Sequence, residues 1–206
     1  MKRRTFLLGA GAPLVLAACG GAREWASDEM VARMAFRDPG PSYLTLMTMI
    51  NNRTGQGGHT SLMANASQRV IWDPAGTFKH SAIPERNDVI YGVNPQVFQV
   101  YRGAHARETH HVVLQKKIVS PEVAERAFAL MRENGPAASA TCAMTTSAIL
   151  QQLDGFERIS SHWYPHKLMA NFAEVPGVIT DKYYENDAGD KKAAFGAAAQ
   201  VQITTN

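Results

Sequence analysis

The sequence predicts an α+β domain in which an antiparallel sheet has helices packed on one side. Strand-like segments follow one another after residue 41, and helical periodicity begins at Ser120 and fills the second half of the chain. The chain has 206 residues, of which 45% are hydrophobic and 19% are charged, enough apolar material for one core. This composition excludes a disordered polyampholyte, a collagen and a disulfide-rich miniprotein.

A secretory signal is predicted over residues 1–18. Its first four residues contain three basic side chains, an apolar run follows from Phe6 to Leu16, and small residues precede Cys19. This is the layout of a signal peptide, and the apolar run is too short for a permanent membrane span.

Cys19 is the expected site of a lipid anchor. The string Leu16-Ala17-Ala18-Cys19 resembles the cleavage site of bacterial lipoproteins, which implies thioether lipidation of Cys19 and cleavage just before it. Gly20 implies the periplasmic face of the outer membrane, because an aspartate there is typical of inner-membrane retention. Arg3-Arg4 is similar to a twin-arginine signal, so that export pathway and Sec both remain open.

The bulk charge does not favour nucleic-acid binding. The chain has 21 Lys and Arg against 18 Asp and Glu, but Lys2, Arg3 and Arg4 lie in the leader. The remaining chain carries 18 basic and 18 acidic side chains and has no excess charge with which to neutralise phosphates. No nucleic-acid partner is therefore expected.

Four regions are predicted along the chain. They are a signal peptide (1–18), a lipidated tether (19–41) with a short helix over Asp28–Phe36, the folded domain (42–184) and a disordered tail (185–206). Within the domain, runs rich in β-branched and aromatic residues predict strands. These strands cover Tyr43–Ile50, His59–Ala64, Arg69–Asp73, Asp88–Val93, Gln96–Tyr101 and His110–Val119.

Helices are predicted in the second half of the domain. Ser120-Pro121-Glu122 is typical of a helix start, since serine caps, proline fits the first turn and glutamate complements the dipole. That helix ends at Asn134-Gly135-Pro136. Further helices are expected over Thr141–Leu153 and Pro165–Ala173, and Val178–Tyr184 returns as a strand.

Cys142 is the candidate nucleophile. Once Cys19 is lipidated, no second cysteine is left to form a disulfide in an oxidising compartment. Cys142 follows a loop of small residues, and either Ser139 or Thr141 as N-cap places it in the first turn of a helix. Free amide N–H groups and the helix dipole favour a thiolate there. A buried, inert thiol is the alternative interpretation.

His59 and Asp73 are the candidate base and the residue that orients it. His59 follows two glycines, which permit close approach to the backbone at the start of a strand. A three-residue loop over Asn65–Ser67 pairs His59 directly with Asp73, so the two side chains share one face of the sheet. A two-residue loop instead places Trp72 opposite His59, so the inference depends on register. A structural histidine and a turn-initiating aspartate are the alternatives.

The candidate residues follow a particular order along the chain: a histidine on an early strand, a polar residue on the next strand, and a cysteine at the start of a later helix. It resembles the circularly permuted NlpC-type papain-like superfamily, which includes relatives of lecithin:retinol acyltransferase, and the resemblance covers Tyr43–Leu153. It implies a permuted papain-like fold with Cys142 as nucleophile, His59 as base and Asp73 as the third member. Many relatives carry a second histidine at the third place. Residues 70–76 are also similar to a group of bacterial lipoproteins.

No cofactor and no metal are expected. His105, His110 and His111 are candidate ligands, but adjacent strand residues point to opposite faces, so His110 and His111 do not share one ion. The aromatic and polar segment from His162 to His166 is interpreted as a helix start with exposed histidines. His166 is expected to lie far from the reactive thiol and to have little effect on it.

These residues together predict a lipid-anchored envelope enzyme that cleaves or transfers an acyl group through an acyl-cysteine intermediate. A cell-wall peptide is the expected substrate, and the acyl chain of a phospholipid or lipoprotein is the alternative. A non-catalytic domain that binds wall peptide or an envelope protein is the interpretation from a different class.

Overall fold

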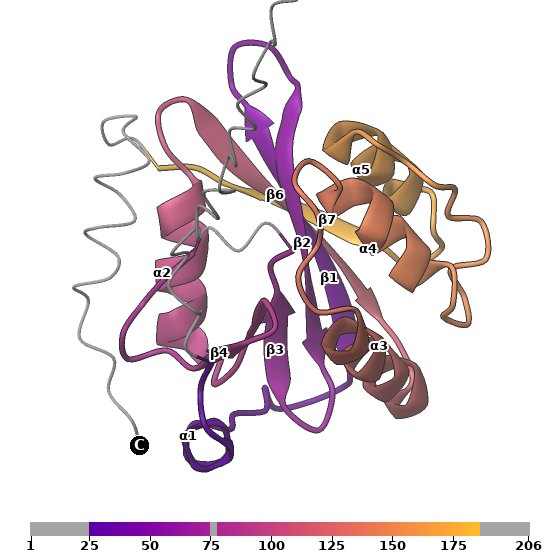
Figure 1. Cartoon of the computed structure of the whole chain (residues 1–206). Coiled ribbons are helices and arrows are strands. Elements are labelled where there is room, and N and C mark those ends of the chain that lie inside the picture. Colours follow the sequence, from indigo (N-terminus) through magenta and orange to yellow (C-terminus); the bar gives the residue numbers. More distant parts are fainter. Residues whose placement is uncertain (1–24, 75–77, 186–206) are drawn as a thin grey trace, which may run out of the picture.

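In the part of the chain that the structure describes, seven strands form one antiparallel sheet in the order β4-β5-β3-β2-β1-β6-β7 (Figure 1). The computed structural model describes residues 25–74 and 78–185. The strands are β1 (Tyr43–Asn51), β2 (Gly57–Asn65), β3 (Arg69–Trp72), β4 (Glu85–Arg86), β5 (Val89–Ile90), β6 (His110–Ile118) and β7 (Ile179–Tyr183). The predicted signal peptide, Cys19 and the tail after Glu185 lie outside the described residues.

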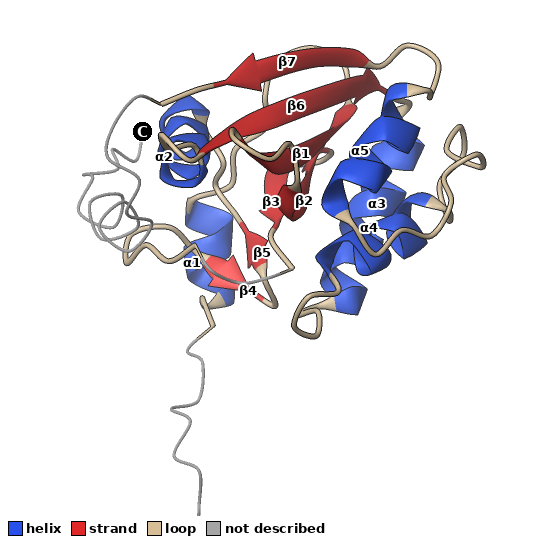
Figure 2. Ribbon diagram, turned by 90° about the horizontal axis from the view of Figure 1, so that it is seen from above, coloured by secondary structure: helices blue, strands red, loops and turns tan. Residues whose placement is uncertain are grey.

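Helices cover both faces of this sheet (Figure 2). They are α1 (Asp28–Arg33), α2 (Pro95–His105), α3 (Pro121–Asn134), α4 (Cys142–Leu150) and α5 (Pro165–Ala173). Helices α3, α4 and α5 pack on one face, and α2 packs on the other. The α+β class is confirmed, but the prediction that all helices pack on one side is wrong. No helix in the described part is long and apolar enough to cross a membrane.

The central strands of the sheet are buried on both faces because hydrophobic cores formed by the described residues flank them. Along β1, Leu44 and Leu46 face the core formed with α3, α4 and α5, whereas Met47 and Met49 face the core formed with α2. Alternate residues of a strand point to opposite faces, so a strand between two cores is buried along its length. This explains why β1 is buried from Tyr43 to Ile50.

Helix α2 occupies the segment that was predicted as the strand Gln96–Tyr101, and that prediction is wrong. The Asn94 side chain accepts a hydrogen bond from the Val97 amide at 2.9 Å, and Pro95 stands in the first turn. This cap and proline are a helix-start signal that outweighs the β-branched composition. Val97, Tyr101 and His105 then recur at intervals of four on the buried face.

The remaining elements follow the predictions with shifted ends. Strands β1, β2, β3, β6 and β7 and helices α1, α3, α4 and α5 form where expected. The predicted strand Asp88–Val93 shrinks to β5, and β4 was not predicted. Residues 25–41, within the segment expected as a tether, contact the domain: the Ala26 amide donates to the Glu85 carbonyl, and Asp38 pairs with Arg69 at 3.1 Å.

Candidate active site

His59 lies at the start of β2, where the approach of α5 requires glycine. A Cβ atom on Gly57 would lie 2.5 Å from the backbone nitrogen of His166 and 2.7 Å from Cβ of Pro165. The pairing of β2 with β1 also slips between Met49 and Ile50, which leaves Gly58 without a partner. The group that approaches Gly57 closely is the first turn of α5 of the same chain, whereas the glycines were predicted to admit a partner or substrate.

Asp73 follows the last residue of β3 and holds the His59 ring. The two atoms His59 Nε2 and Asp73 Oδ1 lie 2.6 Å apart, and the Asp73 side chain is buried. The predicted register, which pairs His59 directly with Asp73, is wrong, because Leu62 pairs with Trp72 and the connecting loop is 66–68. The predicted and observed registers differ by two residues, which is one full period of the pleat. The face of the sheet on which both side chains lie was therefore predicted correctly.

Cys142 is the first residue of α4, with Thr141 as its N-cap. The Thr141 side chain donates to the Ala138 carbonyl instead of capping an amide of the helix. Ala140 has a φ of 62°, a left-handed conformation that a side-chain-bearing residue rarely adopts. The prediction that Cys142 lies in the first turn of a helix is confirmed, and its side chain is partly exposed.

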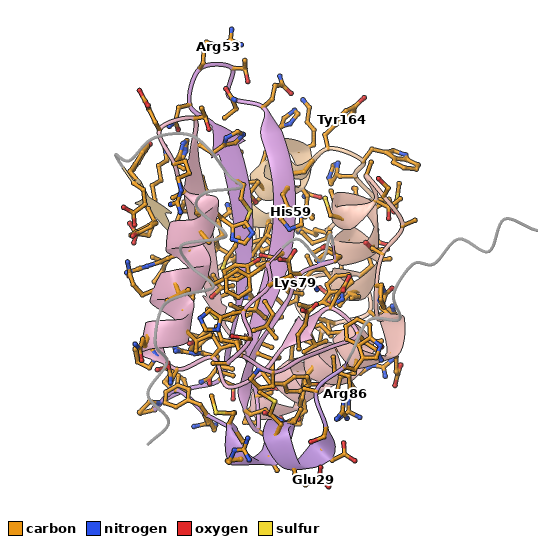
Figure 3. All side chains as sticks on the ribbon, turned by 60° about the vertical axis from the view of Figure 1, so that its left-hand side comes forward. Glu29, Arg53, His59, Lys79, Arg86 and Tyr164 are labelled. Atoms are coloured by element: carbon orange, nitrogen blue, oxygen red, sulfur yellow. The ribbon has the colours of Figure 1, made fainter. Side chains whose placement is uncertain are left out.

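The thiol reaches His59 because β3 is short. Strand β3 pairs with β2 only from Leu62 to Asn65, so the start of β2 has no strand neighbour on that side. The sulfur of Cys142 interacts there with the backbone N–H of Thr60 as well as with that of Ala143. Figure 3 shows the His59 side chain in the middle of the molecule, between α2 and the helices on the other face.

The electrostatics favour a thiolate and an imidazolium. Burial disfavours the charged ring, but the Asp73 carboxylate and hydrogen bonding to Asp73 and Cys142 raise the pKa of His59 to about 9. Burial also raises the pKa of the Cys142 thiol, but the hydrogen bond and charge of His59, helped by the two amides, bring it below its ordinary value. Since Nε2 of His59 faces Asp73, Nδ1 is the nitrogen left for the thiol.

Two side chains of α2 complete the surroundings of Asp73 and were not predicted. His105 stacks on His59 with ring centroids 6.1 Å apart, and its Nε2 lies 3.9 Å from Asp73 Oδ2. The His105 Nδ1 is held by the Tyr101 carbonyl at 2.8 Å. Burial and the Asp73 carboxylate raise the pKa of Tyr101 well above its usual value. The Asn94-Pro95 helix start was the signal that places both residues on one buried face.

The geometry around Asp73 is that of a hydrogen-bonded set of side chains. His59, Asp73 and His105 offer ligand-type atoms within 4.8 Å of one another. The 2.6 Å contact between His59 and Asp73 is nevertheless shorter than the roughly 3 Å that separates two ligands of one zinc ion. His110 and His111 lie on β6, where they pair with Asn51 and Ile50 and so point to opposite faces, as predicted.

Two exposed aromatic side chains directly precede α5. Trp163 and Tyr164 are 61% and 63% exposed, and α5 begins at the following residue, Pro165, as predicted. The Gly57 amide donates to His166 Nδ1 at 3.4 Å, so His166 lies against the start of β2, two residues before His59. In Figure 3, Tyr164 lies above His59.

No family model matches the chain, and neither a curated protein nor a solved structure is significantly similar to it.

Proposed function

We propose that the protein is a thiol hydrolase or acyltransferase that acts on an amide or ester through an acyl-cysteine intermediate. The observation that carries the proposal is the position of His59, whose ring joins a buried carboxylate to a thiol at the start of a helix. A nucleophile, a base and a group that orients the base are the parts that this chemistry needs. As part of this proposal, we assign the domain to the permuted papain-like fold.

In the proposed reaction, the Cys142 thiolate attacks the substrate carbonyl carbon and forms a carbon–sulfur bond. The carbonyl electron pair moves to the oxygen, and the Cys142 N–H, which has no partner within the helix by its position in the first turn, is the candidate donor to this oxyanion. Collapse of the intermediate expels the amine or alcohol, which takes its proton from the imidazolium of His59.

The second half of the reaction restores the enzyme. Neutral His59 takes a proton from water or from an acceptor alcohol or amine, whose oxygen or nitrogen attacks the thioester carbonyl. The carbon–sulfur bond breaks, and the thiolate and imidazolium return. Asp73 keeps the ring in the tautomer that presents Nδ1 to the sulfur and stabilises the imidazolium, so it stays ionised throughout.

We infer a cell-wall peptide as the substrate, because an envelope location gives access to its amides. Acyl chains of phospholipids or lipoproteins are the second candidate, and the exposed Trp163 and Tyr164, which precede the turn of α5 that lies against Gly57, favour them, since aromatic side chains suit a bilayer interface. A binding domain without activity predicts that Cys142 is unreactive towards electrophiles.

The decisive experiment treats the full chain with an activity-based thioester or epoxide probe. Wild type is expected to be labelled at Cys142, and Cys142→Ser and His59→Ala are expected to lose labelling and turnover of wall-peptide or acyl-ester substrates. Persistence of turnover in both variants would show that the reaction does not use this site. Absence of labelling in wild type would favour the binding domain.

We also propose that Cys19 carries a lipid that anchors the chain at the periplasmic face of the outer membrane. Cys19→Ser is expected to abolish incorporation of labelled fatty acid and to move the protein to the aqueous phase of a detergent partition. Equal partitioning of wild type and Cys19→Ser contradicts this proposal. Replacing Arg3 and Arg4 by Lys blocks export if the twin-arginine pathway is used, and unchanged export indicates Sec.

A further inference from the structure

A cavity of about 470 Å³ lies between α1, the turn from β4 to β5 and the C-terminal half of α3. The residues that form its walls include Asp28, Val31, Arg86, Tyr91, Phe128 and Arg132. Gln68 also borders it and follows the end of β2 at Asn65, which is six residues, about 20 Å along the strand, from His59. In Figure 3, Arg86 lies well below His59. The cavity is therefore separate from the candidate active site.

The hydroxyl of Tyr91 is a polar group that opens into this cavity. Tyr91 is 5% exposed, and its ring packs in the core against Phe128 with ring centroids 6.2 Å apart. The hydroxyl has no hydrogen-bond partner among the described residues, and it is not one of the unbonded polar atoms that the protein encloses, so a ligand in the cavity can reach it. Burial raises the pKa of Tyr91, and the charges of Arg132 and Arg86 oppose this rise. A neutral hydroxyl within range of two cations is a suitable donor to an anionic group.

Two charged side chains of the cavity wall are not used within the described protein. Arg86 is neutralised by Asp28, since Nη1 of Arg86 lies 2.6 Å from Oδ1 of Asp28. Arg132 and Glu133, in the last turn of α3, form no ion pair and no hydrogen bond with a described side chain. Arg132 lies over the ring of Phe128 at 5.3 Å, and both charged residues are exposed. Among the described residues, the wall therefore offers one free positive and one free negative charge.

The two free charges match a ligand that carries both signs. Consecutive residues of an α-helix point about 100° apart, so the charged groups of Arg132 and Glu133 diverge. The ammonium and the carboxylate of a single amino acid lie too close together to reach both, whereas those of a dipeptide are separated by a peptide group. An inorganic phosphate ion would be repelled by Glu133 and has no apolar part to place against Val31.

We propose that this cavity binds a short peptide through its free carboxyl and amino ends. The carboxylate accepts hydrogen bonds from Arg132 and the Tyr91 hydroxyl, and the ammonium pairs with Glu133. Small side chains of the peptide lie against Val31 and the Phe128 ring, as in other cavities that combine a few polar groups with apolar walls. This inference stands independently of the activity proposed for Cys142.

Titration calorimetry of the full chain with the dipeptide alanylalanine tests the proposal. Its amide, which lacks the carboxylate, is expected to bind at least about tenfold more weakly, because charge-assisted hydrogen bonds are lost. The N-acetyl derivative, which lacks the ammonium, should bind about threefold to fivefold more weakly, since Glu133 is exposed. Free alanine should bind more weakly than the dipeptide. Equal affinity for the dipeptide and its amide, or no heat at 10 mM dipeptide, overturns the proposal.

Variants identify the cavity and assign each end of the peptide. Tyr91→Phe keeps the ring and should lower dipeptide affinity by about fivefold to tenfold without lowering the Tm, since the hydroxyl has no partner in the described protein. Arg132→Gln should weaken the dipeptide and its N-acetyl derivative by about threefold to fivefold but leave the amide unchanged. Glu133→Gln should weaken the dipeptide and leave the N-acetyl derivative unchanged.

Arg126→Gln is the matched control, because Arg126 lies on the same helix and lines a different cavity. It should leave the affinity for all three ligands unchanged. Equal losses for Arg126→Gln and Arg132→Gln, or an unchanged affinity in Tyr91→Phe, contradict the proposal. Loss of binding to the N-acetyl derivative in Glu133→Gln would contradict the assignment of the amino end.

Discussion

His59 and Asp73 are joined at 2.6 Å although they do not stand opposite each other in the sheet. The register that pairs Leu62 with Trp72 places Asp73 beside Ser61, so His59 and Asp73 are diagonal neighbours on one face. A carboxylate reaches across this diagonal where the pairing of β3 with β2 ends at Trp72, while the Asp73 amide continues the pairing on the β5 side and donates to the Asp88 carbonyl at 2.8 Å. The end of β3 therefore determines both the orientation of His59 and the opening that admits Cys142.

The pH dependence of alkylation is the first prediction. Because the pKa of Cys142 lies below its ordinary value, wild type should react rapidly with iodoacetamide at pH 7, with an inflection below that of a free cysteine at about 8.5. His59→Ala removes the hydrogen bond and the cation, so the inflection should move upward and the rate at pH 7 should fall by about tenfold. His166→Gln, which keeps an acceptor for the Gly57 amide, is the control and should change the rate much less. An inflection that His59→Ala leaves unchanged would identify an ordinary structural thiol.

The second prediction concerns stability and pH, measured in Cys142→Ser so that the thiol does not titrate. With Asp73 and the Cys142 thiolate both beside it, the pKa of His59 is about 9 in the folded state, against about 6.5 in the unfolded chain. Cys142→Ser removes the contribution of the thiolate and keeps that of Asp73, so the folded state still binds the proton more tightly. This stabilisation is complete below pH 6.5 and is lost as the pH rises towards 9, and it is smaller than about 3 kcal/mol. Urea unfolding between pH 6 and 9.5 measures it.

The control for this titration is His59→Gln in the same Cys142→Ser background, since glutamine can still donate a hydrogen bond to Asp73. Its free energy of unfolding should vary much less over the same range. A wild-type-like decrease in the glutamine variant would assign the pH dependence to another group.

The third prediction is that His105 positions the Asp73 carboxylate. Its Nε2 lies 3.9 Å from Asp73 Oδ2, and its ring stacks on His59, so its loss should loosen the carboxylate and the imidazole together. His105→Phe is expected to lower kcat by about tenfold to a hundredfold, with a smaller change in KM, and to move the alkylation inflection upward. His105→Gln should restore part of both effects, because it supplies a polar group where phenylalanine does not. Equal behaviour of the two variants would indicate a packing role only.

The sequence was sufficient to predict the order of most elements and the three candidate residues, because these depend on local signals. Ser120-Pro121 predicts the start of one helix, and the small residues before Cys142 predict the start of a second helix. Which face of the sheet a side chain occupies depends only on whether its register is shifted by an even or an odd number of residues. An error of two residues in register therefore left the predicted face of His59 and Asp73 correct. Helix α2 was missed because its aromatic and β-branched residues also fit a strand, so His105 was considered only as a metal ligand and its position beside Asp73 was not predicted. Proximity of His166 to Gly57 depends on how α5 packs, which no local pattern encodes.

Gly57 provides the last prediction, with its neighbour Gly58 as the control. A Cβ atom on Gly57 would meet the backbone nitrogen of His166 at 2.5 Å, and backbone cannot rotate away as a side chain does. On Gly58, the nearest atom to a Cβ would be His110 Nε2 at 3.5 Å, an ordinary contact. Gly57→Ala should therefore lower the free energy of unfolding by about 2–3 kcal/mol, whereas Gly58→Ala should change it by less than about 0.5 kcal/mol. Because the shift of β2 or α5 in Gly57→Ala moves the backbone two residues from His59, Cys142 alkylation at pH 7 should slow in that variant alone. Equal stability and equal alkylation of the two variants in urea and iodoacetamide assays would mean that α5 does not hold the start of β2 in place.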